Sequence, residues 1–162
     1  MVLASILELS DDAFVMKTQK HADPHQAVSW RKAQAPDRRM LEIIAHESFA
    51  ALPARFRALC HDLLIRIEEF PDEDVIADME LETAFDILGL YQGVDLTRKS
   101  TNDPNPGIDI IFLYRRPLLD YWAESGEQLD HLVAHVLTHE IGHHFGLSDE
   151  DMEEIERETD LP

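Results

Sequence analysis

The residue types that could do chemistry gather in one short stretch of the chain. His139, Glu140 and His143 form the pattern His-Glu-x-x-His, Gly146 follows three residues later, and Asp149 three residues after that. Two histidines one helical turn apart, with a glutamate beside the first, are typical of a catalytic zinc site on a helix. The pattern therefore predicts a metal centre.

A helix expected from about residue 127 to residue 145 would position these side chains. It places His139 and His143 one turn apart, about 6 Å along the axis. Their imidazoles can converge on one zinc ion, which accepts nitrogen ligands at about 2.0–2.1 Å in tetrahedral geometry. Glu140 would then point toward the open coordination position, where it can take a proton from a water molecule and later deliver it to a leaving amine.

The position of Glu140 on this helix favours a functional site over a chance match. At about 100° per residue, one arc of the helical wheel is apolar. Its members are Leu129, Leu132, Val133, Val136 and Leu137. Glu140 and His143 fall within that arc, and His139 lies at its edge. A buried carboxylate is costly unless it has a partner or a function, so an ordinary surface helix would not place one there.

Three further histidines lie on the same helix. His131 and His135 fall progressively further toward solvent. His135 could pair with His139 across one turn, but that pair lacks the buried glutamate, so we expect His135 to be a surface histidine. His144 lies near the opposite edge of the arc. It could contact substrate or support a ligand, but a solvated side chain is the simpler expectation.

The third metal ligand must come from outside the helix. Gly146 is expected to end the helix with positive φ, and the resulting turn could bring Asp149 back to the metal. The segment from Ser148 also looks like a helix start, where Asp149 would act as a capping acid instead. Both readings stay open. The alternative third ligands are Glu153, Glu154 and Glu158.

Helices and short strands are expected to support this site. Asp37 can cap a helix whose apolar positions continue to Leu52, and Pro53 suits the start of a second, shorter helix. Residues 64–68 alternate with period two and predict a strand. Residues 108–114 are apolar on both faces, which predicts a strand inside the sheet.

The segments between these elements are expected to be more irregular. The acidic residues 72–74 predict a solvated loop, residues 81–88 have the apolar spacing of a helix, and residues 97–107 are rich in loop formers. Residues 89–93 follow with two glycines flanking a tyrosine, Gly-Leu-Tyr-Gln-Gly.

Near the active-site helix, Pro117 is expected to open a short helix, and Ser125 with Gln128 predicts a capping box. Residues 1–36 carry no clear element and are expected to be a partly ordered extension. Residues 37–162 would then form the domain.

Composition excludes several classes of protein. The 162 residues suit one domain with its own core. A net charge of −19, from 33 acidic and 14 basic residues, repels phosphate backbones and anionic lipid, so no nucleic-acid or membrane partner is expected. The beginning of the chain lacks a basic signal-peptide region, which indicates a cytoplasmic protein. The single cysteine, Cys60, excludes an intrachain disulfide and is expected to be a small buried hydrophobe.

With these residues in view, the chain resembles the small bacterial zincin-like metallopeptidase family, a group of minimal size. The resemblance runs from about Leu41 to about Ile155 and rests on residues 88–93, 112–119 and 139–152. It implies a compact α+β zincin-like fold, a small mixed sheet packed with about five helices. It also implies a zinc cofactor and a cleft along an edge strand, where a substrate peptide could add.

Carried onto this chain, the resemblance implies His139, His143 and Asp149 as zinc ligands and Glu140 as general base. The leading hypothesis is a zinc metallopeptidase acting on a peptide or protein substrate. The alternatives are a catalytically weak metal-binding or interaction protein of the zincin fold, and a zinc amidohydrolase acting on a non-peptide amide. The residues that could stabilise an oxyanion are Tyr91, Tyr114, Arg115 and His144.

Overall fold

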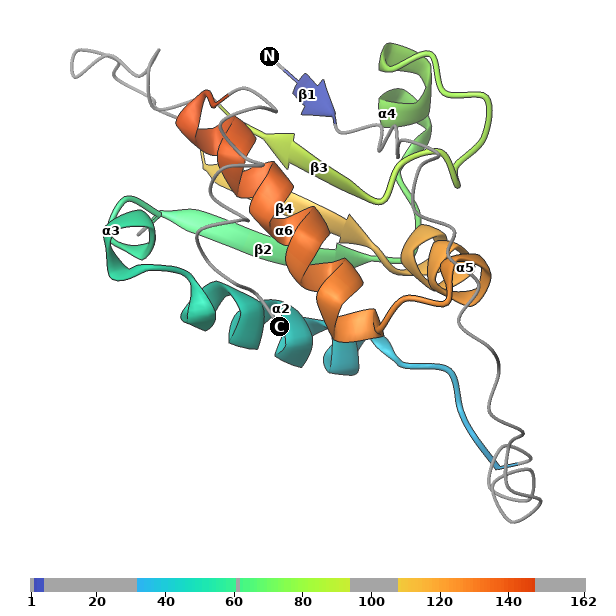
Figure 1. Ribbon diagram of the computed structural model, residues 1–162. Helices are drawn as coiled ribbons and strands as arrows, with labels where there is room; N and C mark the ends of the chain where they lie inside the picture. Colours follow the sequence, from blue (N-terminus) through green and yellow to red (C-terminus); the bar gives the residue numbers. More distant parts are fainter. Residues whose placement is uncertain (1, 5–31, 61, 94–107, 148–162) are drawn as a thin grey trace.

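The computed structural model describes residues 2–4, 32–60, 62–93 and 108–147. In chain order, the elements of these residues are β1 (Val2–Ala4), α2 (Arg38–Ala51), α3 (Ala54–Arg57), β2 (Leu63–Glu68), α4 (Glu73–Asp78), β3 (Gly89–Gln92), β4 (Asp109–Tyr114), α5 (Arg115–Ser125) and α6 (Leu129–Phe145). Figure 1 shows a small sheet with helices packed against it, so the expected α+β class is confirmed.

The sheet is mixed, with strand order β1-β3-β4-β2. β4 runs parallel to β2 and antiparallel to β3, and Ile111 of β4 lies in register with Ile65 on one side and Tyr91 on the other. The prediction of an internal strand over residues 108–114 is therefore confirmed. β1, a strand that was not predicted, pairs antiparallel with the outer side of β3.

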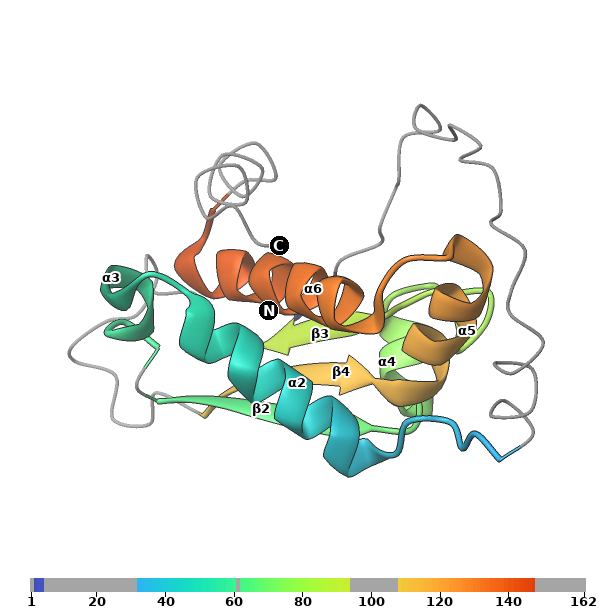
Figure 2. The same ribbon diagram turned by 60° about the horizontal axis from the view of Figure 1, so that its bottom comes forward.

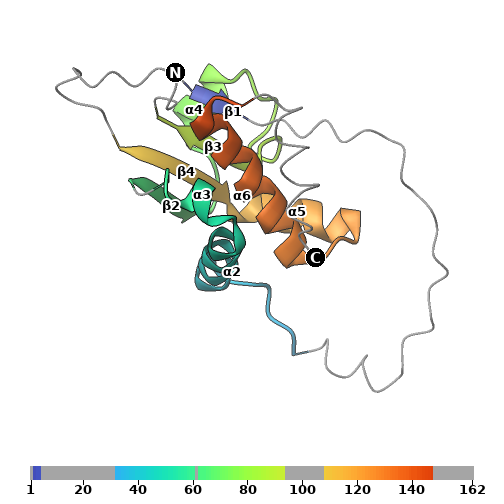
Figure 3. The same ribbon diagram turned by 60° about the vertical axis from the view of Figure 1, so that its left-hand side comes forward.

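Two helices cover one face of the sheet. Figures 2 and 3 show α2 and α6 on the same side, with α2 beside β2 and α6 beside β3. Alternate strand residues point to this side. The core there includes Leu41, Ala45, Ile67, Ile111, Leu113, Val133, Leu137 and Ile141. On the other side of the sheet, Leu90 and Tyr114 form a smaller cluster with Ile87.

The first helices begin where the sequence predicted. The Asp37 carboxylate accepts a hydrogen bond of 2.9 Å from the backbone N–H of Met40, and Pro53 directly precedes α3. The expected strand over residues 64–68 is β2, and the expected helix at Pro117 is α5, which begins two residues earlier at Arg115.

Three local predictions are wrong. Residues 72–74 are no loop: Asp72 caps α4 by accepting a hydrogen bond from Val75, and the acids that follow favour the helix start. Ser125 and Gln128 form no capping box. Instead Ser125 is the last residue of α5, and its hydroxyl accepts a hydrogen bond of 3.2 Å from the Glu127 N–H.

The predicted helix over residues 81–88 is also wrong, because this segment forms turns. Both the N–H and the hydroxyl of Thr83 donate to the Asp86 carboxylate, at 2.7 and 2.8 Å. Such side-chain bonds give the backbone an alternative to the helix. The apolar residues Leu81 and Leu88 pack onto the sheet from this irregular segment.

The expected loop over residues 97–107 lies outside the described residues, as does most of residues 1–36. The division into an extension and a domain at residue 37 therefore stays a prediction. None of the helices in the described ranges is long and apolar enough to cross a membrane.

Removing the α2 cap should weaken the fold without touching the site. Asp37→Ala leaves a backbone N–H without its acceptor and is expected to lower the free energy of unfolding by about 1 kcal/mol. Urea denaturation measures the loss. Asp37→Asn keeps a capping oxygen and serves as the control, so an equal loss in both variants would contradict this account.

Candidate metal centre

Helix α6 carries the predicted site and ends as expected. Gly146 has φ 70° and ψ 27°, the left-handed conformation. The N–H of Leu147 donates to the carbonyl of Gly142, and that of Gly146 to the carbonyl of His143, both at 3.0 Å. These bonds satisfy carbonyls of the last turn and reverse the chain. The predicted positive φ at Gly146 is confirmed.

The two motif histidines lie close together on this helix. The ring centroids of His139 and His143 are 4.8 Å apart, with their planes at 84°. Both side chains are partly buried, and Nε2 of His143 has almost no exposed surface. Imidazoles at this distance can each present a nitrogen to one ion.

Glu140 faces the sheet and is fully buried, as the helical wheel predicted. Its Oε2 accepts a hydrogen bond of 2.8 Å from the backbone N–H of Tyr91 on β3. Its Oε1 is buried and accepts no hydrogen bond from the described residues. Burial raises the pKa of this carboxyl from 4.5 to about 8, and the Tyr91 hydrogen bond opposes that shift.

The contact between Glu140 and β3 depends on Gly89. A Cβ at this position would lie 2.7 Å from Val136 Cγ1 and 3.1 Å from both Cγ and Oε1 of Glu140. The first distance is shorter than real side chains adopt, so any other residue would push β3 and α6 apart. The absence of a side chain at residue 89 is therefore what lets the β3 backbone reach the carboxylate.

A second set of buried polar side chains lies beside Glu140. The Tyr91 hydroxyl donates to Asp109 Oδ1 at 3.0 Å and lies 3.2 Å from His144 Nδ1. That nitrogen is also 3.7 Å from Asp109 Oδ2. All three residues are at most 2 % exposed. Together they connect β3, β4 and α6.

The expectation of a solvated His144 is wrong. His144 follows Glu140 by one turn, so it lies over the sheet next to Tyr91 and is only 2 % exposed. Asp109 was missed altogether. An acid between the apolar residues Ile108 and Ile110 was the available signal, since a strand predicted to be internal should not hold an unpartnered carboxylate.

The other candidate oxyanion donors have structural contacts. Arg115 pairs with Glu69 at 2.9 Å and donates to the carbonyl of Pro36 at 2.7 Å. Tyr114 is buried on the opposite side of the sheet from Tyr91, and burial, followed by nearby acids that include Glu140, raises its pKa. An oxyanion role for any of these residues stays a prediction.

The candidates for the third ligand follow α6 in the sequence. Asp149, Glu153, Glu154 and Glu158 all lie outside the described residues. Within the described part, no three histidine, cysteine, aspartate or glutamate side chains form a group that could hold a metal ion. The two adjacent imidazoles nevertheless fit zinc, and the buried Glu140 carboxyl beside them has an oxygen that accepts no hydrogen bond from the described residues.

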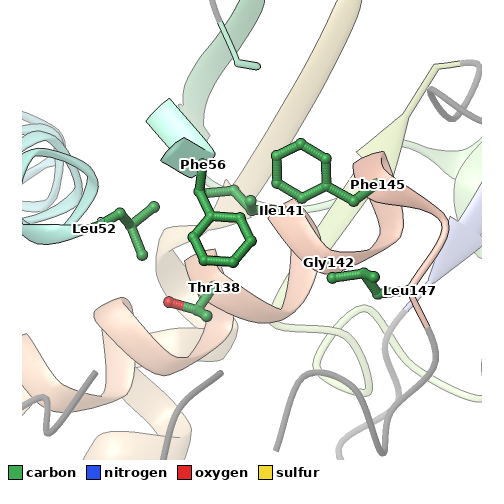
Figure 4. Close-up of a pocket in the computed structure, with 7 residues that line it drawn as sticks. All are labelled: Leu52, Phe56, Thr138, Ile141, Gly142, Phe145 and Leu147. Carbon is green, nitrogen blue, oxygen red and sulfur yellow. The ribbon is translucent and has the colours of Figure 1, made fainter. Parts of the chain in front are cut away.

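An apolar pocket lies on another side of α6. Figure 4 shows its lining, which comes from the end of α2, from α3 and from the last turns of α6. The lining residues are Leu52, Phe56, Thr138, Ile141, Gly142, Phe145 and Leu147. Neither the motif histidines nor Glu140 line it, so this pocket is distinct from the candidate metal centre.

Cys60 is a structural residue, as expected. It is 4 % exposed and belongs to the main core. Burial raises the pKa of its thiol to about 11, so the reactive thiolate is disfavoured.

Comparison with known proteins identifies the class. The sequence model of the zincin-like metallopeptidase family matches residues 60–159, which include β2, β3, β4, α6 and the complete motif. The chain belongs to this family. No curated protein matches the chain.

Adding a methyl group at residue 89 should disturb the metal centre. Gly89→Ala forces β3 away from Val136 and Glu140 and is expected to cost about 1–3 kcal/mol of stability. It should also weaken zinc binding, measured by competition with a chromophoric chelator. Gly126→Ala is the control: its Cβ meets open space, and its φ of 70° costs about 1 kcal/mol far from the motif. Unchanged zinc affinity in Gly89→Ala would contradict the close-approach argument.

Proposed function

We propose that this protein is a zinc-dependent metallopeptidase in which Glu140 is the general base. The observation that carries the proposal is the environment of the Glu140 carboxyl, namely its burial and its hydrogen bonds. Its carboxyl is fully buried next to two adjacent histidines, one oxygen is fixed by a backbone N–H, and the other accepts no hydrogen bond from the described residues. Family membership supports the same class of activity.

His139 and His143 would hold the zinc ion, with Asp149 as the proposed third ligand. Zinc, when bound, would polarise the scissile carbonyl and make a water molecule acidic near neutral pH. Asp149 is favoured by its offset from Gly146, whose left-handed conformation reverses the chain directly after α6. Glu153, Glu154 and Glu158 remain the alternatives.

Glu140 supplies the proton transfers. The Tyr91 N–H holds Oε2, which leaves Oε1 to take a proton from the attacking water. Its burial makes the protonated carboxyl accessible near neutral pH, so the same group can deliver the proton to the leaving amine. One carboxyl can thereby serve both halves of amide hydrolysis.

A peptide is the proposed substrate. An extended peptide can pair with the edge of a sheet through its backbone. α6 packs against β3, and beyond β3 the described sheet ends in β1. Substrate approaching α6 would therefore meet the β3–β1 side of the sheet.

Replacing Glu140 should abolish most activity while zinc stays bound. Glu140→Gln keeps an oxygen for the Tyr91 N–H but removes the base, so cleavage of a peptide library should fall by about 10²–10⁴-fold. Mass spectrometry of the cleaved library and metal analysis measure the two effects. Glu124→Gln, an exposed change on α5, is the control. Zinc binding with no Glu140-dependent cleavage would favour a metal-binding protein or an amidohydrolase of non-peptide substrates.

Zinc binding should depend on both histidines and on Asp149. His143→Ala should remove stoichiometric zinc, and Asp149→Ala should lower zinc affinity by about 10–100-fold or more while the far-UV circular dichroism stays unchanged. Unchanged affinity in Asp149→Ala would assign the third position to a downstream glutamate. A wild-type protein that binds no added zinc would refute the proposed function.

A further inference from the structure

A polar cluster beside the metal centre has no part in the proposed chemistry. Tyr91, Asp109 and His144 come from β3, β4 and α6, and each is almost completely buried. Burying polar groups is expensive, and the cost is offset only when they bond to one another in a defined geometry. The cluster lies where the sheet approaches the motif helix, next to Glu140.

We propose that Tyr91, Asp109 and His144 are positioning residues of the metal centre. They hold the last turns of α6 at a fixed distance from β3 and so keep Glu140 and the two histidines in their working arrangement. This inference rests on the proposed function, because it assigns the cluster a role at the same site.

Tyr91 is the link between the cluster and the base. Its backbone N–H donates to Glu140 Oε2 at 2.8 Å, while its hydroxyl donates to Asp109 Oδ1 at 3.0 Å. A shift of Tyr91 toward or away from β4 would therefore move the donor that fixes Glu140. His144 Nδ1 lies 3.2 Å from the same hydroxyl. Because His144 directly follows His143, this contact also restrains the helical turn that carries His143, a proposed zinc ligand.

The glycines on either side of Tyr91 support this role. A Cβ at Gly93 would lie 2.3 Å from Asp109 Oδ1 and 2.6 Å from the Tyr91 hydroxyl, so a side chain there would break that hydrogen bond. Gly89 leaves room for Glu140 in the same way. The pattern Gly-Leu-Tyr-Gln-Gly is thus explained by the two contacts of its tyrosine.

Tyr91→Phe tests the proposal, because it removes the hydroxyl but keeps the ring and the N–H that binds Glu140. Zinc affinity and kcat should each fall by about 10–100-fold, the usual effect of losing a group that orients a metal site. KM should stay within about threefold, since the substrate contacts are unchanged. Asp109→Asn, which keeps the shape and weakens the acceptor, should act in the same direction. Tyr121→Phe on α5 is the matched control and should change neither quantity.

A combined variant separates positioning from general stability. In a Glu140→Gln background, Tyr91→Phe should lower the residual cleavage by a smaller factor than it lowers wild-type cleavage, because only its effect through the zinc ligands remains, although it still lowers the melting temperature of the protein. The proposal is overturned if Tyr91→Phe behaves like Tyr121→Phe, or if its effect on kcat is just as large without Glu140. If the wild type cleaves no peptide, the proposed function fails. Zinc affinity and the absorption spectrum of the Co²⁺-substituted protein then still decide whether the cluster positions the ligands.

Discussion

The hydrogen bond from the Tyr91 backbone to the Glu140 carboxylate is the contact on which the rest of the site depends. It requires a strand backbone and a helix side chain to meet inside the core, where a charge without partners would be unstable. The strand can approach only because Gly89 has no side chain against Val136 and Glu140. The distance between β3 and α6 therefore sets the position of the proposed base.

Burying the Glu140 carboxyl costs the fold stability, and the packing of α6 offsets this cost. The helix is buried against α2 as well as against the sheet, and its apolar residues form much of the main core. The side chains of His139 and His143 remain partly exposed. The buried apolar surface can thus offset an expensive carboxyl, a pattern expected where function overrides local stability.

Features that depend on local periodicity could be predicted from the sequence. The predictions failed where a residue distant in the sequence determines the environment of a side chain. The α6 pattern was enough to predict a buried Glu140 and a left-handed Gly146, and Asp37 was enough to predict the start of α2. His144 looked solvent-exposed because its partner Tyr91 is 53 residues away in the sequence. Asp109 was missed for the same reason, since its bond to Tyr91 joins two strands whose pairing no local pattern specifies.

The failed prediction of a helix over residues 81–88 and the geometry of the site have a common cause. Apolar residues with helical spacing favour a helix locally, but the segment must deliver an extended β3 to the side of α6 at Gly89. The Thr83–Asp86 hydrogen bonds stabilise the turns that replace the helix. The chain can then enter the sheet with Gly89 opposite Glu140. Tertiary constraint at the carboxylate therefore overrides local propensity several residues before the strand begins.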